Sequence, residues 1–353
     1  MEGRRATLRL LSDCDNACLF CAQRGGEPVA LAAGSVVEGL RALRGEGFDE
    51  VTFTGGEPAR AEGLLDAVRA ARSAGFTAVG AQTHGRRLRE GALAADLARA
   101  GLTDVHLSLH GLGPALHDLH TGVPGSFAEA AAGLTAAGTA GLTVVVNTVL
   151  TRSNGRSLRE LGAWLRSRGV AGWCVSVPRA AGALRARFDP VFPRLGIALP
   201  HALRALAAAQ REGVAVFLRG APSCLLGPFA ARCVPDAPRA FDPGRCEGCA
   251  ARGACAGLDP VYLARFGGDE LSAARAPKGR HRRSRAATRR SRGCSSARAR
   301  WSRTPPRTMQ DRGLNGQHRV HPGRTALQSL LRVLLEPHDA VRAHLRDHEG
   351  AGR

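Results

Sequence analysis

The chain has 353 residues, of which 44% are apolar, and a formal net charge of +20. That length allows one large domain and a smaller one, and that apolar content can fill a sizeable core. No run of about 18 uncharged apolar residues occurs, so we expect no membrane span. The apolar core of a signal peptide is also missing near the N-terminus, so we expect a cytoplasmic protein with reduced thiols.

The positive charge is concentrated near the C-terminus. Residues 1–271 hold 30 Lys and Arg against 25 Asp and Glu, an excess of 5, whereas residues 272–353 hold 20 against 5, an excess of 15. Any argument from net charge therefore concerns the last quarter of the chain rather than the part that precedes it.

Up to about residue 178 the sequence alternates β-like runs with helical stretches, in which apolar residues recur at steps of three and four. The expected strands are Ala6–Leu11, Glu50–Thr54, Thr77–Gln82, Asp104–His110, Thr143–Thr148 and Trp173–Val177. The expected helices are Val36–Leu43, Gly63–Ala74, Arg87–Ala100, Phe127–Ala137 and Leu158–Arg168, and a helix at Leu199–Glu212 and a strand at Ala215–Leu218 follow. Six repeats predict a parallel sheet with helices outside it. Because six units are too few for a complete eight-stranded barrel, we expect an α/β fold with a partial (β/α)6 barrel over residues 1–220, with reactive groups at the carboxyl ends of its strands.

Three cysteines directly follow the first expected strand: Cys14, Cys18 and Cys21. In a reduced compartment, clustered thiols indicate a metal site or redox chemistry more often than disulfides. Iron–sulfur cubanes normally take four cysteines, so three leave one iron with an open position, which catalysis at a metal requires. A zinc site and incidental cysteines are the alternatives.

A second motif ends the second expected strand and consists of Gly55, Gly56, Glu57 and Pro58. Two glycines let the backbone approach a ligand closely, and the glutamate offers a carboxylate for a ligand ammonium group. Alone, this would be an ordinary strand-to-helix turn. Together with the Cys-x3-Cys-x-aromatic-Cys spacing, in which Phe20 is the aromatic residue, it resembles the motifs of the radical S-adenosylmethionine (SAM) superfamily.

The resemblance covers residues 6–271 and implies a [4Fe-4S] cluster on the three cysteines, whose open iron binds the amino and carboxylate groups of SAM. It implies reductive cleavage of SAM to a 5′-deoxyadenosyl radical that abstracts a substrate hydrogen. Reduced flavodoxin or ferredoxin would supply the electron. The catalytic residues would be Cys14, Cys18 and Cys21, and the motif from Gly55 to Pro58, with Phe20, would contact the cofactor.

Weaker matches end later strands. Ser108 and Asn147 stand where similar enzymes contact the ribose and carboxylate of SAM, although each could be a satisfied polar group at a strand end. Residues 83–85 read Thr-His-Gly where many relatives carry Thr-Asn-Gly, which leaves the role of His84 open. Val175–Pro178 closes the sixth strand and could flank adenine or substrate.

His110, His117 and His120 suggest a metal site, and the last two have a helical spacing. Residues 111–114 include two glycines and a proline, which indicate a loop rather than a rigid platform for ligands. We therefore expect substrate contact or solvent exposure for these histidines rather than metal binding.

The segment 221–271 is rich in Cys, Pro and Gly and can build little hydrophobic core. It therefore needs a stabilising cross-link such as a bound metal. Cys246, Cys249 and Cys255 resemble the core of the SPASM/Twitch auxiliary-cluster domains that follow the barrel in many radical SAM enzymes. Those SPASM domains usually continue with a further Cys, which is replaced here by Asp259. The pattern is therefore incomplete for a domain that binds two clusters.

We expect a single auxiliary [4Fe-4S] cluster in this segment. Its predicted ligands are Cys224, Cys246, Cys249 and Cys255. Cys233 could replace Cys224, and zinc bound by four thiolates is the rival metal. Cys174 is expected to be a buried strand residue.

Residues 272–353 are dominated by Arg, Ser, Pro, Gly and His, and we expect most of this tail to be disordered. It could bind RNA or DNA through phosphates, but no aromatic residues are interleaved to stack on bases. The abrupt change in composition favours the hypothesis that the tail is a frameshifted or fused reading of neighbouring DNA. Cys294 lies within it and has no evident partner.

Within the superfamily, barrels followed by Cys-rich domains resemble enzymes that modify peptides and proteins or that build cofactors. We therefore expect a peptide substrate first, a small cofactor precursor second, and tRNA or rRNA third. A non-catalytic iron–sulfur carrier or binding module is the rival class. The glycines and Glu57 argue against it, because a carrier does not need a SAM site.

Overall fold

The computed structural model describes residues 4–234, 236 and 239–274. All of these belong to the first of two units into which the chain divides. The predictions for the basic tail beyond residue 274, including Cys294, lie outside the described residues. Among the described residues, no helix is both long and apolar enough to cross a membrane.

The framework is a parallel sheet of eight strands in sequential order, with β1 at one edge and β8 at the other. The strands are β1 (Arg5–Leu11), β2 (Glu50–Gly55), β3 (Ala78–Thr83), β4 (Asp104–Ser108), β5 (Thr143–Val149), β6 (Gly172–Ser176), β7 (Ala215–Arg219) and β8 (Cys233–Val234). Sequential order with parallel pairing is the topology of an open, partial barrel, so the predicted fold class is confirmed. The short β8 extends the predicted set of strands.

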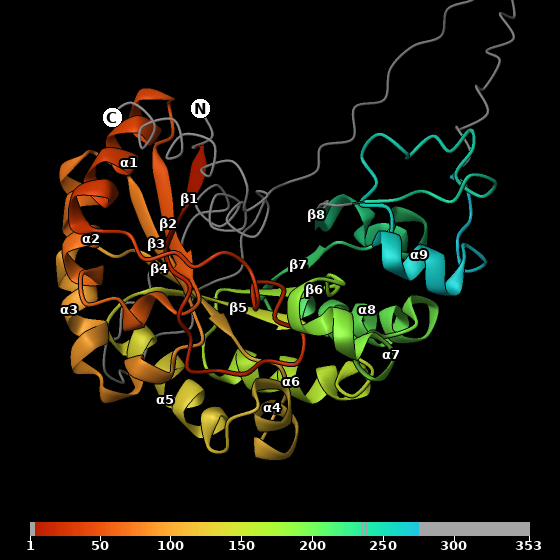
Figure 1. The fold of residues 1–353 in the computed structure, drawn as a ribbon. Coiled ribbons are helices and arrows are strands. Elements are labelled where there is room, and N and C mark those ends of the chain that lie inside the picture. The colour runs from red at the N-terminus through yellow and green to blue at the C-terminus, as the bar shows by residue number, and fades with distance from the viewer. Residues whose placement is uncertain (1–3, 235, 237–238, 275–353) are drawn as a thin grey trace, which may run out of the picture. The chain divides into compact units, whose positions relative to one another are not determined.

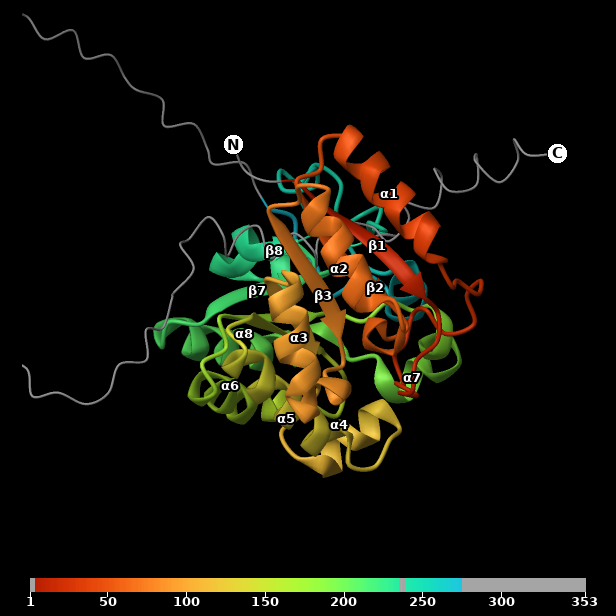
Figure 2. The same cartoon turned by 90° about the vertical axis from the view of Figure 1, so that its left-hand side faces the viewer.

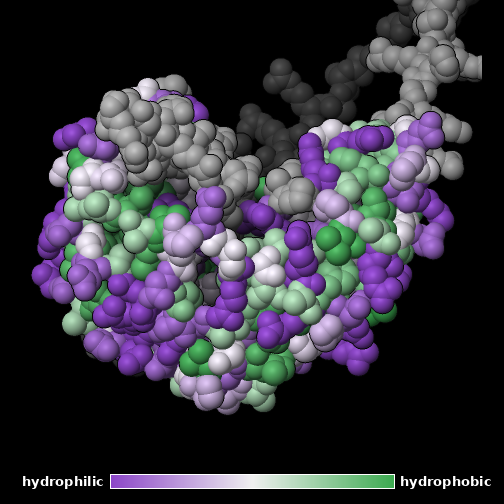
Figure 3. Space-filling model, in the orientation of Figure 1, coloured by the Kyte–Doolittle hydropathy of each residue, from purple (hydrophilic) through white to green (hydrophobic). Residues whose placement is uncertain are grey.

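Helices connect the strands and cover the outer side of the sheet, as Figures 1 and 2 show for α1, α2 and α3 over the first strands. The helices are α1 (Ala33–Gly45), α2 (Leu64–Ser73), α3 (Ala92–Ala100), α4 (Pro114–Thr121), α5 (Ser126–Thr139), α6 (Leu158–Ser167), α7 (Phe188–Val191), α8 (Leu195–Arg211) and α9 (Pro260–Phe266). Short 3₁₀ turns are η1 (Pro58–Arg60), η2 (Arg86–Glu90), η3 (Gly155–Ser157), η4 (Gly182–Arg187), η5 (Ser223–Leu225) and η6 (Gly227–Arg232). The surface of this helical layer is largely hydrophilic on the face shown in Figure 3.

The two faces of the sheet differ because side chains alternate along each strand. Outward residues are apolar: Leu8 of β1 lies against Gly39 of α1, and the Trp173 ring of β6 packs on the backbone of α6 at Gly162. A side chain at Gly162 would collide with that ring, so the glycine allows the helix to approach the sheet. The inward face is polar, which leaves it available for chemistry.

A buried ion network occupies the inward face near the amino ends of β1, β2 and β4. The Arg5 guanidinium donates to Glu50 at 2.6 Å and to Asp104 at 2.9 Å, and His106 lies 3.2 Å from the same Asp104 carboxylate. Burial opposes ionisation of Asp104, but Arg5 and His106 outweigh it and hold its pKa below the usual range. Gly80 of β3 makes room, since a Cβ atom there would overlap Asp104. This network closes the end of the barrel opposite to the predicted site.

Candidate active site

The loop that follows β1 carries Cys14, Cys18 and Cys21, as predicted. Burial raises the pKa of the Cys14 thiol to about 11 and, with the help of the two neighbouring thiols, that of Cys18 to about 12. These thiols therefore stay protonated at neutral pH unless a cation binds them and displaces their protons. The three sulfurs are a donor set that suits an iron–sulfur cluster.

Backbone hydrogen bonds from three elements hold this cysteine loop (residues 12–21). The end of β2 donates through Gly56 N–H to the Leu11 carbonyl and through Glu57 N–H to the Asp13 carbonyl, both at 2.8 Å. The last turn of α4 accepts from Ala17 N–H at 2.7 Å and from the N–H of residue 19 at 2.9 Å, and η4 donates to the carbonyl of residue 21 at 2.9 Å. The position of the loop therefore depends on the ends of three elements that are far apart in sequence.

The two glycines of the second motif serve the cysteine loop directly. A Cβ atom on Gly55 would overlap the carbonyl oxygen of Leu11, and one on Gly56 would overlap the carbonyl oxygens of Ser12 and Asp13. Each overlap is closer than the 3.0 Å that real Cβ atoms essentially never breach. We predicted a close approach to a ligand here, whereas the structure shows a close approach to the backbone of the cysteine loop.

Glu57 is 1% exposed, and its carboxylate is bonded to protein donors. One oxygen accepts from Ala59 N–H at 3.0 Å and from the Thr83 hydroxyl at 2.6 Å, and the other accepts from His84 N–H at 2.8 Å. The carboxylate thereby caps η1, which begins at Pro58, and joins the end of β2 to the end of β3. Sequence reasoning did not foresee this tie between the strands.

His84 lies beside the first cysteine. Its Nε2 atom is 2.8 Å from Asp15 and 3.3 Å from Glu57. Donor atoms of Cys14, Asp15 and His84 all lie within 4.8 Å of one another. His84 therefore contributes a polar side chain to the wall of the site at the place where many relatives carry Asn.

Ser108 and Asn147 lie in one lateral row on the inward face, because they are paired in the β4–β5 register. Cys174 continues this row on β6 and is buried, as predicted. Ser176, two residues further along β6, donates its hydroxyl to the Asn147 side-chain oxygen at 2.6 Å. The structure thus brings the predicted strand-end residues together on the face that carries the cysteine loop, and it adds Ser176 to them.

The predicted loop is found at residues 111–113, but α4 begins at Pro114, and the three histidines are not solvent-exposed, which was one of the two roles expected for them. Residues 114–121 form α4, and His110, His117 and His120 are each 3% exposed or less. The His110 ring lies 4.6 Å from the Phe20 ring, and backbone N–H groups donate to Nδ1 of His110 and of His117. Burial lowers the pKa of all three, that of His117 to about 4, so they are neutral supports beneath the cysteine loop.

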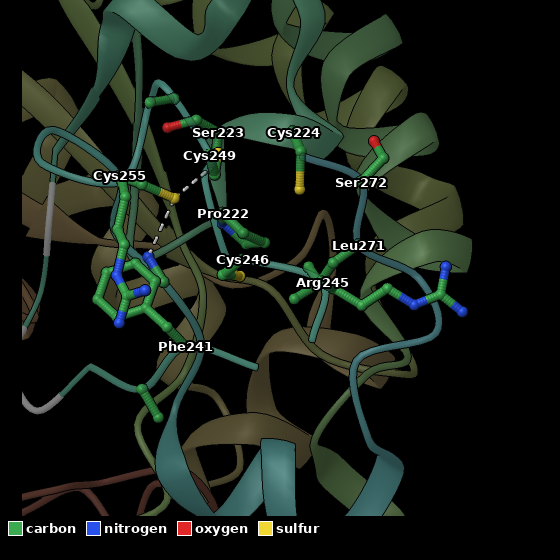
Figure 4. A pocket seen from close by; sticks show the side chains of 14 residues that line it. Pro222, Ser223, Cys224, Phe241, Arg245, Cys246, Cys249, Cys255, Leu271 and Ser272 are labelled. Atoms are coloured by element: carbon green, nitrogen blue, oxygen red, sulfur yellow. Dashed lines mark hydrogen bonds between the residues drawn. The ribbon is translucent and has the colours of Figure 1, made fainter. Parts of the chain in front are cut away.

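A second group of thiols lines a pocket in the C-terminal segment, shown in Figure 4. Its sulfur-bearing residues are Cys224, Cys246, Cys249 and Cys255. Backbone N–H groups of Ser223 and Gly257 donate to the Cys255 sulfur at 3.2 and 3.3 Å, and Ala274 N–H donates to the Cys249 sulfur at 3.3 Å. Donors aimed at sulfur stabilise thiolates and tune iron–sulfur clusters, so these residues fit a metal cluster.

Cys233 and Asp259 have other roles. The Cys233 thiol does not line the pocket and donates to the Ala221 carbonyl at 3.3 Å. Asp259 caps α9 by accepting from Val261 N–H and also accepts from Ala180 N–H, both at 2.9 Å. Since both carboxylate oxygens of Asp259 bind backbone donors, it is part of the framework rather than of the pocket.

Comparison with known proteins agrees with this geometry. Residues 9–165 match the Radical SAM superfamily. One curated relative is a probable GTP 3′,8-cyclase of Thermococcus kodakarensis, which is 34% identical over 129 residues, or 35% of this chain and 41% of the relative. Another is an AdoMet-dependent heme synthase of Oleidesulfovibrio alaskensis, which is 29% identical over 123 residues, or 35% of this chain and 31% of the relative. The chain thus spans less than half the length of either relative. The fold resembles that of SuiB of Streptococcus suis bound to SAM, with a TM-score of 0.53 and 18% identity over 62% of this chain and 51% of SuiB.

The matched part of the chain contains β1 to β5, the cysteine loop and the Gly-Gly-Glu motif. This part of the chain is similar to the Radical SAM superfamily, and its fold resembles that of SuiB.

Proposed function

We propose that this enzyme cleaves SAM reductively at a [4Fe-4S] cluster held by Cys14, Cys18 and Cys21. The observation that carries the proposal is the way in which the cysteine loop is held by the ends of β2, α4 and η4. The cysteine loop holds three partly buried thiols and no fourth cysteine, which would leave one iron for SAM. When bound, the cluster would pass one electron to SAM, whose C–S bond would break to give methionine and a 5′-deoxyadenosyl radical.

The residues of this chain would bind and orient SAM around that iron. The wall around SAM would be formed by Phe20 of the cysteine loop and by the adjacent motif, Gly55, Gly56, Glu57 and Pro58. Glu57 would support the SAM site indirectly, by holding the ends of β2 and β3 together, because its carboxylate oxygens already accept three hydrogen bonds from the protein. On β4 and β5, the hydroxyl group of Ser108 and the amide group of Asn147 would contact the ribose and carboxylate of SAM.

The C-terminal pocket would hold one auxiliary [4Fe-4S] cluster on Cys224, Cys246, Cys249 and Cys255. Cys224 is preferred to Cys233 as the first ligand, because it lines the pocket whereas the Cys233 sulfur is bonded to a carbonyl elsewhere. The backbone donors to two of the sulfurs support a cluster over an incidental group of thiols. Zinc remains the rival metal for four thiolates.

The substrate that we propose is a peptide or protein, because a Cys-rich segment follows the barrel and resembles SPASM/Twitch domains. The domains that we propose are the barrel (residues 1–220) and the auxiliary domain (residues 221–271), followed by the basic tail (residues 272–353). Nucleic acid would bind only through that tail. A small nucleotide-like cofactor precursor is the second candidate, supported by the similarity to probable GTP 3′,8-cyclases. Reduced flavodoxin or ferredoxin would be the electron donor.

Anaerobic reconstitution tests the proposal. Full-length protein supplied with iron, sulfide, SAM and dithionite should form 5′-deoxyadenosine even without substrate, and a Cys18→Ala variant should not. About eight irons per chain would indicate two clusters, and about four with zinc present would indicate one. A filled first cluster that yields no 5′-deoxyadenosine would favour an electron carrier instead.

A further inference from the structure

Two arginines stand at the carboxyl ends of β6 and β7, next to the row of predicted SAM contacts. Arg219 is the last residue of β7 and is paired in register with Ser176, whose hydroxyl bonds to Asn147. Arg179 follows β6 by three residues. Paired residues in neighbouring parallel strands point to the same face, so Arg219 faces the inward side on which Ser176 and Asn147 lie.

The two guanidinium groups share one carboxylate oxygen. Arg219 Nη2 lies 3.0 Å from Asp236 Oδ1, and Arg179 Nη1 lies 3.9 Å from the same atom. The side chains are 9% exposed for Arg219, 30% for Arg179 and 11% for Asp236. Two positive charges thus meet one negative charge in this trio, at a largely buried position.

Both arginines also have buried donors with no acceptor in the described part of the chain. The Nε–H groups of Arg179 and Arg219 are buried and make no hydrogen bond there. A buried donor without a partner costs free energy, and the cost is larger for a charged group. A mere structural ion pair would not need a second arginine with an unsatisfied donor, so the pair is better explained by an acceptor that arrives with a ligand.

We propose that Arg179 and Arg219 bind an anionic oxygen group of the substrate, a carboxylate or a phosphate. A guanidinium presents parallel N–H donors that match the two oxygens of such groups. Asp236 would hold the arginines in place until the ligand binds. The inference rests on the proposed function, since it assigns the substrate to the same inward face as SAM, and it adds a chemical requirement that a substrate must meet.

Anaerobic titration calorimetry on the full-length reconstituted protein tests the site, with inorganic phosphate and glutarate as probes. At least one probe should bind saturably, and Arg219→Gln should weaken binding about tenfold or more. Arg211→Gln is the matched control, because it removes an exposed charge at the end of α8, four residues before β7 begins, and should change nothing. The better probe separates a phosphate-bearing substrate from a carboxylate-bearing one.

The Asp236→Asn variant distinguishes anion binding by the two arginines from a purely structural role of the arginines and Asp236. It removes the carboxylate that competes with the ligand, so binding should stay equal or become tighter, whereas a purely structural trio would show reduced stability and no change in binding for any variant. If Arg219→Gln fails to fold, Arg179→Gln and Arg219→Lys take its place. No saturable binding by the wild type, or equal binding by the arginine variants, overturns the proposal. Formation of 5′-deoxyadenosine without substrate does not use these arginines, so either proposal can fail alone.

Discussion

The close approach between Gly56 and the cysteine loop can be tested with a single methyl group. In Gly56→Ala the new Cβ would overlap the carbonyl oxygens of Ser12 and Asp13 at less than 3.0 Å. Restoring ordinary contact requires a shift on the order of 1 Å, and the overlapping atoms are backbone that cannot swing away. The shift also strains the hydrogen bonds from Gly56 and Glu57 to the loop, each worth about 1 kcal/mol.

Cys14 directly follows the displaced residues, so the cluster and SAM would lose their alignment. A misplacement of about 1 Å can cost about 100-fold in rate, and we expect a loss of that order in 5′-deoxyadenosine formation. The assay is anaerobic turnover with dithionite, together with the electron paramagnetic resonance spectrum of the reduced cluster with and without SAM. Gly63→Ala is the control, since Gly63 is exposed with nothing within 4 Å of a Cβ there. Wild-type turnover by Gly56→Ala would refute the reasoning.

Two further variants test the pocket and the buried network. Cys224→Ser should lower the metal content of the C-terminal site by iron and zinc analysis, whereas Cys233→Ser should not; equal losses would contradict the ligand assignment. Asp104→Asn leaves Arg5 partly unpaired and should lower the free energy of unfolding in urea by about 3–5 kcal/mol at pH 7, against about 0.5 kcal/mol or less for the exposed Asp66→Asn. Because the folded-state pKa of Asp104 is depressed, its contribution to stability is present above about pH 4 and is lost on acidification. The free energies of unfolding of the wild type and Asp104→Asn should therefore converge at low pH. A difference that stays constant with pH would contradict this.

The strands were predictable because the alternation of β-like and helical segments is strong and local. Each of the six predicted strands of the barrel overlaps an observed strand, and boundaries differ by only a few residues, as for β3 at Ala78–Thr83. The two-residue β8 could not be predicted, since its pairing with β7 depends on a tertiary contact rather than on a pattern. The helix α4 was missed because glycine and proline at 113 and 114 suggested a loop, whereas Pro114 occupies the first turn, where proline is tolerated.

The site was predictable in its residue types but not in its connections. The spacing of the cysteines and the Gly-Gly-Glu motif pointed to the candidate residues, because each motif lies at the end of a predicted strand. The bonds from Glu57 to Thr83 and His84 depend on strand order, and so does the burial of His117 and His120 beneath the cysteine loop. No local signal in the sequence distinguishes a buried neutral histidine from an exposed one. Arg179 and Arg219 were missed for the same reason. They are forty residues apart in sequence and come together only because β6 and β7 are neighbours in the sheet.

Asp259, which stands where the resemblance to SPASM domains would place a cysteine, has a structural role. A carboxylate has two oxygens, and here one caps α9 while the other accepts from Ala180 N–H. Each backbone donor thus has a carboxylate oxygen of its own. Ala180 is three residues from Ala183, whose N–H donates to the carbonyl of Cys21. The C-terminal segment and the cysteine loop are therefore tied through the turn after β6, and Asp259 is the residue that joins this turn to α9.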